Sequence, residues 1–263
     1  MLRKLLKYDL KYILKFLMIF YSLALVFSVL TRVFLNIENS LVFNIIGQIF
    51  NGAAISMMCS SLINNVMCLW ARFRRNLYLD ESYLTHTLPI EPYKHYLSKI
   101  ATLVISLFTS IAVITVCIFC AYYSKENLDI LKSLLLPIAD MFESNAVSFV
   151  AMFITVLFLQ FANIIQCGFT GIITGHMMNN GKVGFSVLFG FITYIITQGI
   201  VLLTVFIIAL FKSEMMELFT TNSISDISLL KDTFYICIAI YLAIFIGLAV
   251  ANIRLLKKGV NVD

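Results

Sequence analysis

The 263 residues are 61% hydrophobic and only 13% charged, with a net charge of +5 and a mean hydropathy of +0.96. A soluble domain usually carries roughly 25% charged residues, so this chain has too little polar surface to cover a water-soluble globule. The composition excludes an ordinary cytosolic enzyme, a disordered protein and a nucleic-acid binder, and it indicates a polytopic membrane protein.

The N-terminal segment 1–15 has a helical charge pattern. Lys4, Lys7, Lys11 and Lys15 follow one another at steps of three or four residues, with leucines on the opposite side. This spacing predicts an amphipathic helix that lies along the cytoplasmic surface of the membrane. Its role is either a simple anchor or a lever joined to the first span.

Six apolar segments are each long enough to cross a bilayer as a helix, which takes about 20 residues. The fold class predicted from them is an all-α polytopic membrane protein whose six-helix transmembrane domain covers residues 16–258. The expected spans are 16–35, 41–67, 100–123, 146–173, 184–211 and 233–253.

The charges between these spans predict the topology. Most lysines and arginines lie before the first span, between the second and third, and after the sixth, whereas the alternate loops hold most of the acidic residues. The positive-inside rule then places both termini in the cytoplasm. We expect a multi-pass protein of the plasma (inner) membrane. The role of Arg32, at the outer end of the first span, stays open between contact with lipid headgroups and contact with cargo.

The loop 72–99 is the one sizeable polar stretch predicted on the cytoplasmic side. Acidic residues and Ser82 favour the start of a short helix near residue 80, and Pro89 is expected to end it. Pro92 suits the first turn of the next helix, which continues into the third span. A short helix held outside the bilayer indicates docking to a soluble partner, and a merely solvated loop is the alternative.

This loop resembles the first cytoplasmic loop of ATP-binding-cassette permeases, in the six-span exporter class common in Gram-positive bacteria. The resemblance is carried by the stretch DESYLTHTLPI at residues 80–90, by LSK at 97–99 and by LLKYDL at 5–10. Members typically have an acid, Gly-Tyr-Leu, Thr-Leu-Pro-Val and then Ser-Lys, so Ser82 departs from the usual glycine. The span count and loop order match over the whole length.

The resemblance implies a coupling helix at about Leu79–Leu88 that docks into a nucleotide-binding ATPase subunit. ATP-driven closure of two such subunits would push this helix and reorient the bundle. A second permease, identical or a sister chain, would complete the transporter. The residues expected to contact the ATPase are Asp80, Glu81, Tyr83, Leu84, Thr85, Leu88 and Pro89.

The sequence contains no phosphate-binding G-x-x-x-x-G-K-[ST] loop and no G-x-S-x-G nucleophile motif. We therefore expect no enzymatic activity and no cofactor in this chain, with ATP and Mg²⁺ bound by the partner subunit. The three histidines lack metal-ligand spacing, so no metal site is expected. No acidic residue lies in the middle of a span, which argues against ion-coupled transport.

Polar residues recur inside three of the predicted spans. Lipid offers amides no hydrogen-bond partner, so these residues must face protein or water. They either form contacts between helices or subunits or line a translocation path. The residues in question are Asn44, Gln48, Asn51, Ser56 and Ser60 in the second span, Gln160 and Asn163 in the fourth, and Gln198 in the fifth. By contrast, Gly171-x-x-x-Gly175 is interpreted as a packing motif.

Two extracellular loops, near 124–145 and 212–231, are richer in apolar residues than free loops are. The first is expected to act as an interfacial cap or a gate. The second is expected to contain a short helix that dips into the outer leaflet.

The leading hypothesis is a permease subunit that exports an amphipathic or hydrophobic cargo, such as an antimicrobial peptide, an antibiotic or a lipid-like molecule. Transport of an antimicrobial peptide would imply a role in resistance. The alternative is a non-transporting membrane partner, such as a sensor or an assembly factor. That alternative predicts that the loop around Tyr83 binds a protein other than an ATPase.

Overall fold

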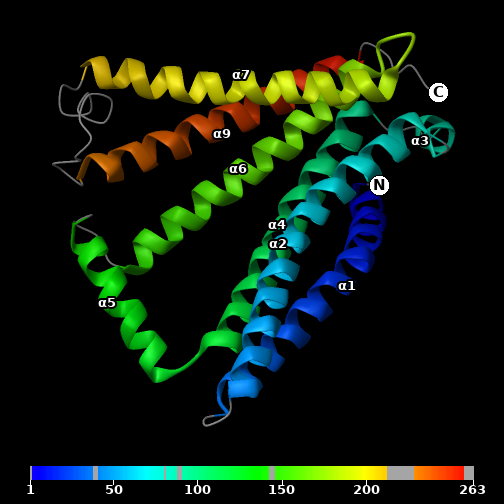
Figure 1. The fold of residues 1–263 in the computed structure, drawn as a ribbon. Coiled ribbons are helices and arrows are strands. Elements are labelled where there is room, and N and C mark those ends of the chain that lie inside the picture. The colour runs from blue at the N-terminus through cyan, green and yellow to red at the C-terminus, as the bar shows by residue number, and fades with distance from the viewer. Residues whose placement is uncertain are drawn as a thin grey trace. The chain divides into compact units, whose positions relative to one another are not determined.

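The computed structural model describes residues 2–37, 41–79, 81–87, 91–141, 146–211 and 228–257. Nearly all of these residues are helical (Figure 1), and six of the described helices are long and apolar enough to cross a membrane. The predicted all-α fold with six spans is therefore confirmed. The helices are α1 (Leu2–Leu35), α2 (Leu41–Tyr78), α3 (Ser82–Thr87), α4 (Pro92–Tyr122), α5 (Lys125–Met141), α6 (Ala146–Gly175), α7 (Lys182–Phe211) and α9 (Ser228–Lys257).

The chain forms two compact units, Met1–Asp129 and Ile130–Asp263. The first holds α1 to α4 and the start of α5, and the second holds the remainder of α5 with α6, α7 and α9. Each unit therefore contains three of the six long apolar helices.

In the first unit, α1 and α4 run parallel and α2 runs antiparallel to both. The Tyr21 hydroxyl of α1 lies 2.7 Å from the Ser110 hydroxyl of α4, and Asn65 of α2 donates to the same Ser110 oxygen at 2.9 Å. At one end of the unit, the rings of Phe73 and Tyr96 meet edge to face. One buried serine thus ties together all three long helices of this unit.

Apolar side chains fill the space around these bonds. Leu17, Leu103 and Leu107 are fully buried, and a second cluster joins Ala24, Ala54, Met58 and Cys117. Cys117 of α4 thus packs as a small apolar residue. Because lipid chains are as apolar as leucine, close packing and buried hydrogen bonds hold such helices together, rather than exclusion of water.

In the second unit, α6 and α7 approach each other closely along small residues. A Cβ atom added at Gly171 would collide with the backbone of Ser186 and Gly190, and one added at Gly175 would collide with Ser186. Each helix thus contributes two small residues spaced by four, the pattern that lets transmembrane backbones come together. The interpretation of Gly171-x-x-x-Gly175 as a packing motif is confirmed.

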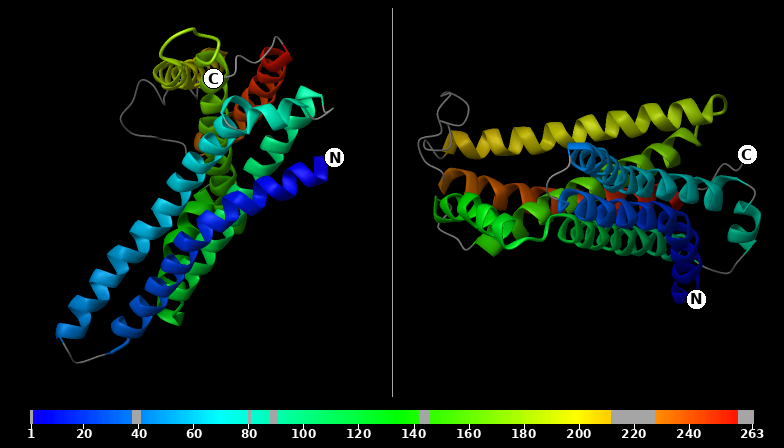
Figure 2. Two further views of the ribbon diagram at one scale, coloured as in Figure 1. Left: turned by 90° about the vertical axis from the view of Figure 1, so that its right-hand side faces the viewer. Right: turned by 60° about the horizontal axis from the view of Figure 1, so that its bottom comes forward.

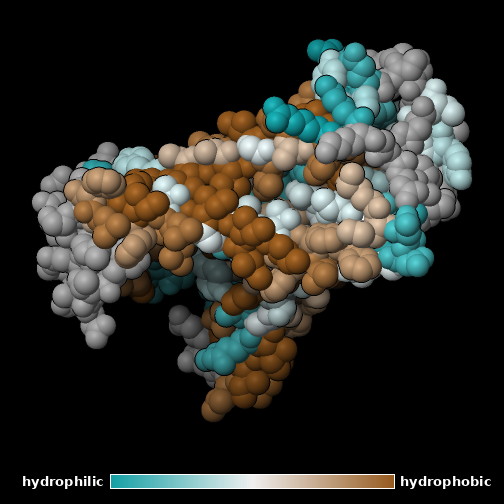
Figure 3. All heavy atoms as spheres, turned by 90° about the horizontal axis from the view of Figure 1, so that it is seen from above, coloured by the Kyte–Doolittle hydropathy of each residue, from teal (hydrophilic) through white to brown (hydrophobic). Residues whose placement is uncertain are grey.

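The outer surfaces of the helices are strongly apolar. Figure 3 shows brown, hydrophobic side chains over much of the face in view, and most large apolar residues of α7 are exposed. Exposed apolar side chains along helices of this length suit contact with lipid chains.

Several helix ends differ from the predicted spans. The predicted surface segment 1–15 and the first span form one continuous helix, α1, which bends so that its first turns run at an angle to the remainder (Figure 2). Helix α5 fills most of the predicted outer loop 124–145. Most of the other outer loop, residues 212–227, lies outside the described residues.

Candidate functional site

The helices on both sides of the predicted coupling loop extend well past the apolar spans. Helix α2 continues to Tyr78, eleven residues beyond the predicted span end at 67, and α4 starts at Pro92, eight residues before 100. At 1.5 Å per residue, these extensions are about 16 Å and 12 Å long. They carry the loop helix α3 away from the apolar segments.

Helix α3 is a short helix with two contrasting faces. Tyr83 is 68% exposed, whereas Ser82 is fully buried and its backbone N–H donates to the Leu79 carbonyl at 2.7 Å. The Thr85 hydroxyl donates to the Glu81 carbonyl at 2.9 Å. The expected short helix is confirmed, and Pro92 lies in the first turn of α4 as expected.

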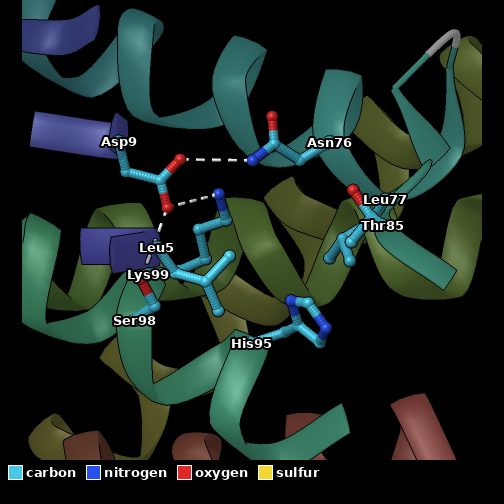
Figure 4. A pocket seen from close by; sticks show the side chains of 8 residues that line it. All are labelled: Leu5, Asp9, Asn76, Leu77, Thr85, His95, Ser98 and Lys99. Carbon is cyan, nitrogen blue, oxygen red and sulfur yellow. Dashed lines mark hydrogen bonds and ion pairs between the residues drawn. The ribbon is translucent and has the colours of Figure 1, made fainter. Parts of the chain in front are cut away.

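A buried carboxylate, Asp9 of α1, lines a small pocket together with Thr85 of this loop (Figure 4). It is only 2% exposed, and four side chains converge on its two oxygens. The Oδ1 atom accepts from Arg72 Nε at 3.1 Å and Asn76 Nδ2 at 3.2 Å, and the Oδ2 atom accepts from Lys99 Nζ at 2.7 Å and Ser98 Oγ at 3.4 Å. One side chain of α1 is thereby bonded to both α2 and α4.

Arg72 extends these contacts to the loop. Its Nη1 atom donates to both carboxylate oxygens of Glu81, at 3.0 Å and 2.8 Å, and Arg75 adds an ion pair to Glu81 at 3.1 Å. The Arg72 guanidinium also lies 4.7 Å from the centre of the Tyr12 ring of α1. A continuous chain of ionic contacts therefore runs from α1 through α2 to the residue that precedes α3.

These charges are largely withdrawn from solvent. The side chains of Asp9, Arg72 and Lys99 are 3%, 12% and 7% exposed, whereas Glu81 is 32% exposed. Taking charges out of water is costly, and in such pairs the loss of one partner costs about 3–5 kcal/mol because the other charge stays buried. The cluster is therefore sensitive to any movement that separates its members.

A small pocket adjoins the cluster. It is lined by Leu5, Asp9, Asn76, Leu77, Thr85, His95, Ser98 and Lys99, which come from α1, α2, α3 and α4. The pocket has room for a water molecule rather than a cargo. Leu5 reaches this pocket from the apolar side of the first turns of α1, so that side packs against protein here.

Of the residues expected to contact an ATPase, the structure describes three completely. Glu81 is paired with Arg72 and Arg75, Tyr83 is exposed, and Thr85 is partly buried at the pocket. Leu84 belongs to α3, but its side chain is outside the described set. Asp80, Leu88 and Pro89 also fall outside the described residues.

The polar residues predicted along α2 fall into two groups. Asn44, Gln48 and Ser56 are exposed, and Gln48 donates to Asn44 at 3.4 Å. Asn51 accepts a hydrogen bond from Tyr122 of α4, and Ser60 is partly buried. The first group forms an exposed polar row on α2, whereas Asn51 joins two helices of the same unit.

The predicted polar residues of the second unit all form contacts between its own helices. Gln160 donates to the Tyr194 hydroxyl at 3.2 Å, and Asn163 donates to the Thr197 hydroxyl at 3.1 Å. Gln198 accepts from Tyr241 at 3.1 Å. These contacts favour the helix-packing interpretation over the translocation path for these three positions.

Sequence reasoning missed Asp9 as the centre of the cluster. The signal was present, because Asp9 is the only acidic residue in positions 1–35 and lies opposite Lys7 and Lys11 on a helical projection. A charge on the apolar side of an amphipathic helix needs a buried partner. Its main partner, Lys99, was noted as a basic residue of the loop and as part of the LSK motif at 97–99, and was not paired with Asp9.

Comparisons with known proteins add no relative. No protein-family model matches the chain, no curated protein matches it, and no solved structure matches it. The six apolar helices nevertheless make it a multi-pass membrane protein.

Proposed function

We propose that this chain is the membrane-spanning permease subunit of an ATP-binding-cassette exporter, driven by ATP that a separate subunit binds and hydrolyses. The observation that supports this proposal is the construction of the loop. A short helix with an exposed tyrosine stands about 12–16 Å beyond the apolar spans. Glu81, the residue before it, is ion-paired to Arg72 of α2, which is paired in turn to Asp9 of α1. A loop that only connected two spans would need four to six residues.

In this mechanism, closure of two ATPase subunits pushes α3. Glu81 passes the displacement to Arg72, and Arg72 passes it to Asp9, which Lys99 also holds. Because α2 and α4 are unbroken helices from the loop into the bilayer, movement at the ends that meet the loop reorients the spans. Both termini and this loop lie on the cytoplasmic side in the proposed topology.

The cargo path is proposed to involve the exposed polar row on α2. Lipid provides no hydrogen-bond partner for Asn44 or Gln48, so these amides would face the cargo or a second permease subunit, identical or a sister chain. The row carries amides and hydroxyls without charge, which suits an amphipathic or hydrophobic cargo such as a peptide antibiotic or a lipid-like molecule.

The first experiment is purification of the tagged chain from its native membrane in mild detergent, followed by identification of the bound proteins. We expect a stoichiometric soluble ATPase that carries a phosphate-binding loop. Absence of an ATPase even with a non-hydrolysable nucleotide present would contradict the proposal. A stoichiometric partner without ATPase motifs would instead favour the sensor or assembly-factor function.

A pair of matched variants tests the docking surface. Tyr83→Ala is expected to lower ATPase retention at least tenfold because it removes the exposed ring of α3. Tyr235→Ala, which truncates a comparably exposed tyrosine of α9, should leave retention unchanged. Equal retention by both variants would exclude α3 as the docking helix.

A further inference from the structure

The first four turns of α1 carry an exposed basic face, which consists of Arg3, Lys4, Lys7, Lys11 and Lys15. Within the part of the chain that the structure describes, none of these five side chains forms an ion pair or a side-chain hydrogen bond. Five cations therefore stand together without an anionic partner.

The acid that would offset this face is buried elsewhere. Asp9, the only acidic residue of α1, points into the protein and is neutralised by Arg72 and Lys99. The outward side of this segment is consequently purely positive. Like charges at three- and four-residue spacing repel one another, so an external anion near this side would relieve the repulsion.

The same face of α1 becomes apolar one turn after Lys15. Continuing along the helix at steps of three and four residues, the exposed side chains are Met18, Val26, Val29 and Val33, with Ser22 bonded back to the Ile19 carbonyl. This change from basic to apolar side chains fits an edge of the hydrocarbon layer between Lys15 and Met18. The basic face therefore begins where lipid headgroups begin.

Two further features fit a position at the headgroups. Tyr8, Tyr12 and Phe16 are exposed in a row beside the lysines, and aromatic rings of this kind gather at membrane–water interfaces. Figure 2 shows that α1 bends, so its first turns run at an angle to the remainder. Along a straight helix, roughly 16 Å would separate Lys4 from Lys15. Electrostatic attraction to a charged surface reaches about 8–10 Å in physiological salt.

We propose that the basic face of α1 binds the headgroups of anionic phospholipids. An acidic protein segment would satisfy the charges equally well. The lipid is favoured because the basic face continues directly into apolar side chains on one helix surface. Each basic residue near an anionic surface strengthens binding about fivefold.

The test uses the full-length chain, delipidated in non-ionic detergent and mixed with equal amounts of phosphatidylglycerol and phosphatidylcholine of identical acyl chains. Native mass spectrometry then counts the lipids of each kind that stay bound. The wild-type chain is expected to retain phosphatidylglycerol in preference, and 1 M salt is expected to weaken that preference.

Variants then assign the preference to the basic face. A fourfold variant should reduce the preference for phosphatidylglycerol at least tenfold; it combines Lys4→Gln, Lys7→Gln, Lys11→Gln and Lys15→Gln. Arginine at the same four positions should keep the preference. These side chains are exposed, so circular dichroism should show unchanged helicity.

A matched pair supplies the control. Lys11→Gln with Lys15→Gln should lower the preference, and Lys125→Gln with Lys132→Gln, which changes two exposed lysines of α5, should not. Equal retention of both lipids by the wild-type chain would overturn the proposal, as would an unchanged preference in the fourfold glutamine variant.

Discussion

Asp9→Asn is the substitution that most directly tests the buried cluster. Asparagine keeps the shape of the side chain but removes the charge that neutralises Lys99 at 2.7 Å and Arg72 at 3.1 Å. At 2.7 Å the attraction between two unit charges is about 6 kcal/mol at an effective dielectric constant of 20. Part of this attraction offsets the cost of desolvation, so the expected loss of unfolding free energy is about 3–5 kcal/mol.

Removal of the cationic partner should lower the unfolding free energy less than removal of the Asp9 charge. Lys99→Met leaves Asp9 paired with Arg72 and bonded to Asn76, so we expect a loss of about 1–2 kcal/mol. The double variant combines Asp9→Asn with Lys99→Met, so it has neither an unpaired charge at position 99 nor the ion pair between positions 9 and 99. Its destabilisation should therefore fall below the sum of the two single losses by about 2 kcal/mol, within the range for directly contacting residues.

The measurement is unfolding in mixed micelles titrated with sodium dodecyl sulfate, followed by fluorescence of Trp70. This residue is the only tryptophan of the chain and lies two residues before Arg72 on α2, so it reports on the cluster. A loss below 1 kcal/mol for Asp9→Asn, or strictly additive losses in the double variant, would refute the assignment of a tightly coupled buried pair.

Three further predictions test close helix packing, a hydrogen bond between helices and a buried hydroxyl. Gly171→Ala should destabilise the second unit by about 1–3 kcal/mol through overpacking. Gly184→Ala is the control and should be neutral or stabilising, because a Cβ atom added there meets no atom within 4 Å. Thermal unfolding in detergent compares the two variants, and equal effects would contradict the close approach of α6 and α7. Thr197→Val should cost about 0.6 kcal/mol, typical for a hydrogen bond between membrane helices, and a cost near zero in the same assay would mean that Asn163 gains nothing from this contact. Ser82→Ala should be neutral or slightly stabilising in denaturant titrations, because it removes a buried hydroxyl that has no partner among the described residues, and a clear loss would show that this hydroxyl is bonded.

The six spans were predictable because the bilayer sets both their length and their composition. Their ends were not, since Arg72 and Arg75 continue α2 as a helix outside the apolar region, where hydropathy carries no information about helix termini. The bent start of α1 was likewise predicted as a separate element, on the change from lysines to apolar residues. That change reflects a different environment along the helix and does not require a break in its backbone hydrogen bonds.

The candidate site was predictable in its local part only. Glu81 and Tyr83 stand out because charge, proline and apolar residues near them follow a recognisable order along the chain. The pairing of Asp9 with Lys99 joins residues far apart in sequence, so it depends on how α1 packs against α4. The same holds for Asn163 and Gln160, whose partners on α7 are set by the close approach of two glycine-containing helix surfaces.

The parallel packing of α1 and α4 restricts how the first unit can move. Asp9 meets Lys99 and Tyr21 meets Ser110, so two polar contacts join the helices at points about three turns apart. A slide of α1 by one turn along α4 would break both contacts at once and leave buried polar groups without partners. In the proposed mechanism, displacement of the loop would therefore tilt or rotate the two helices as one rigid body.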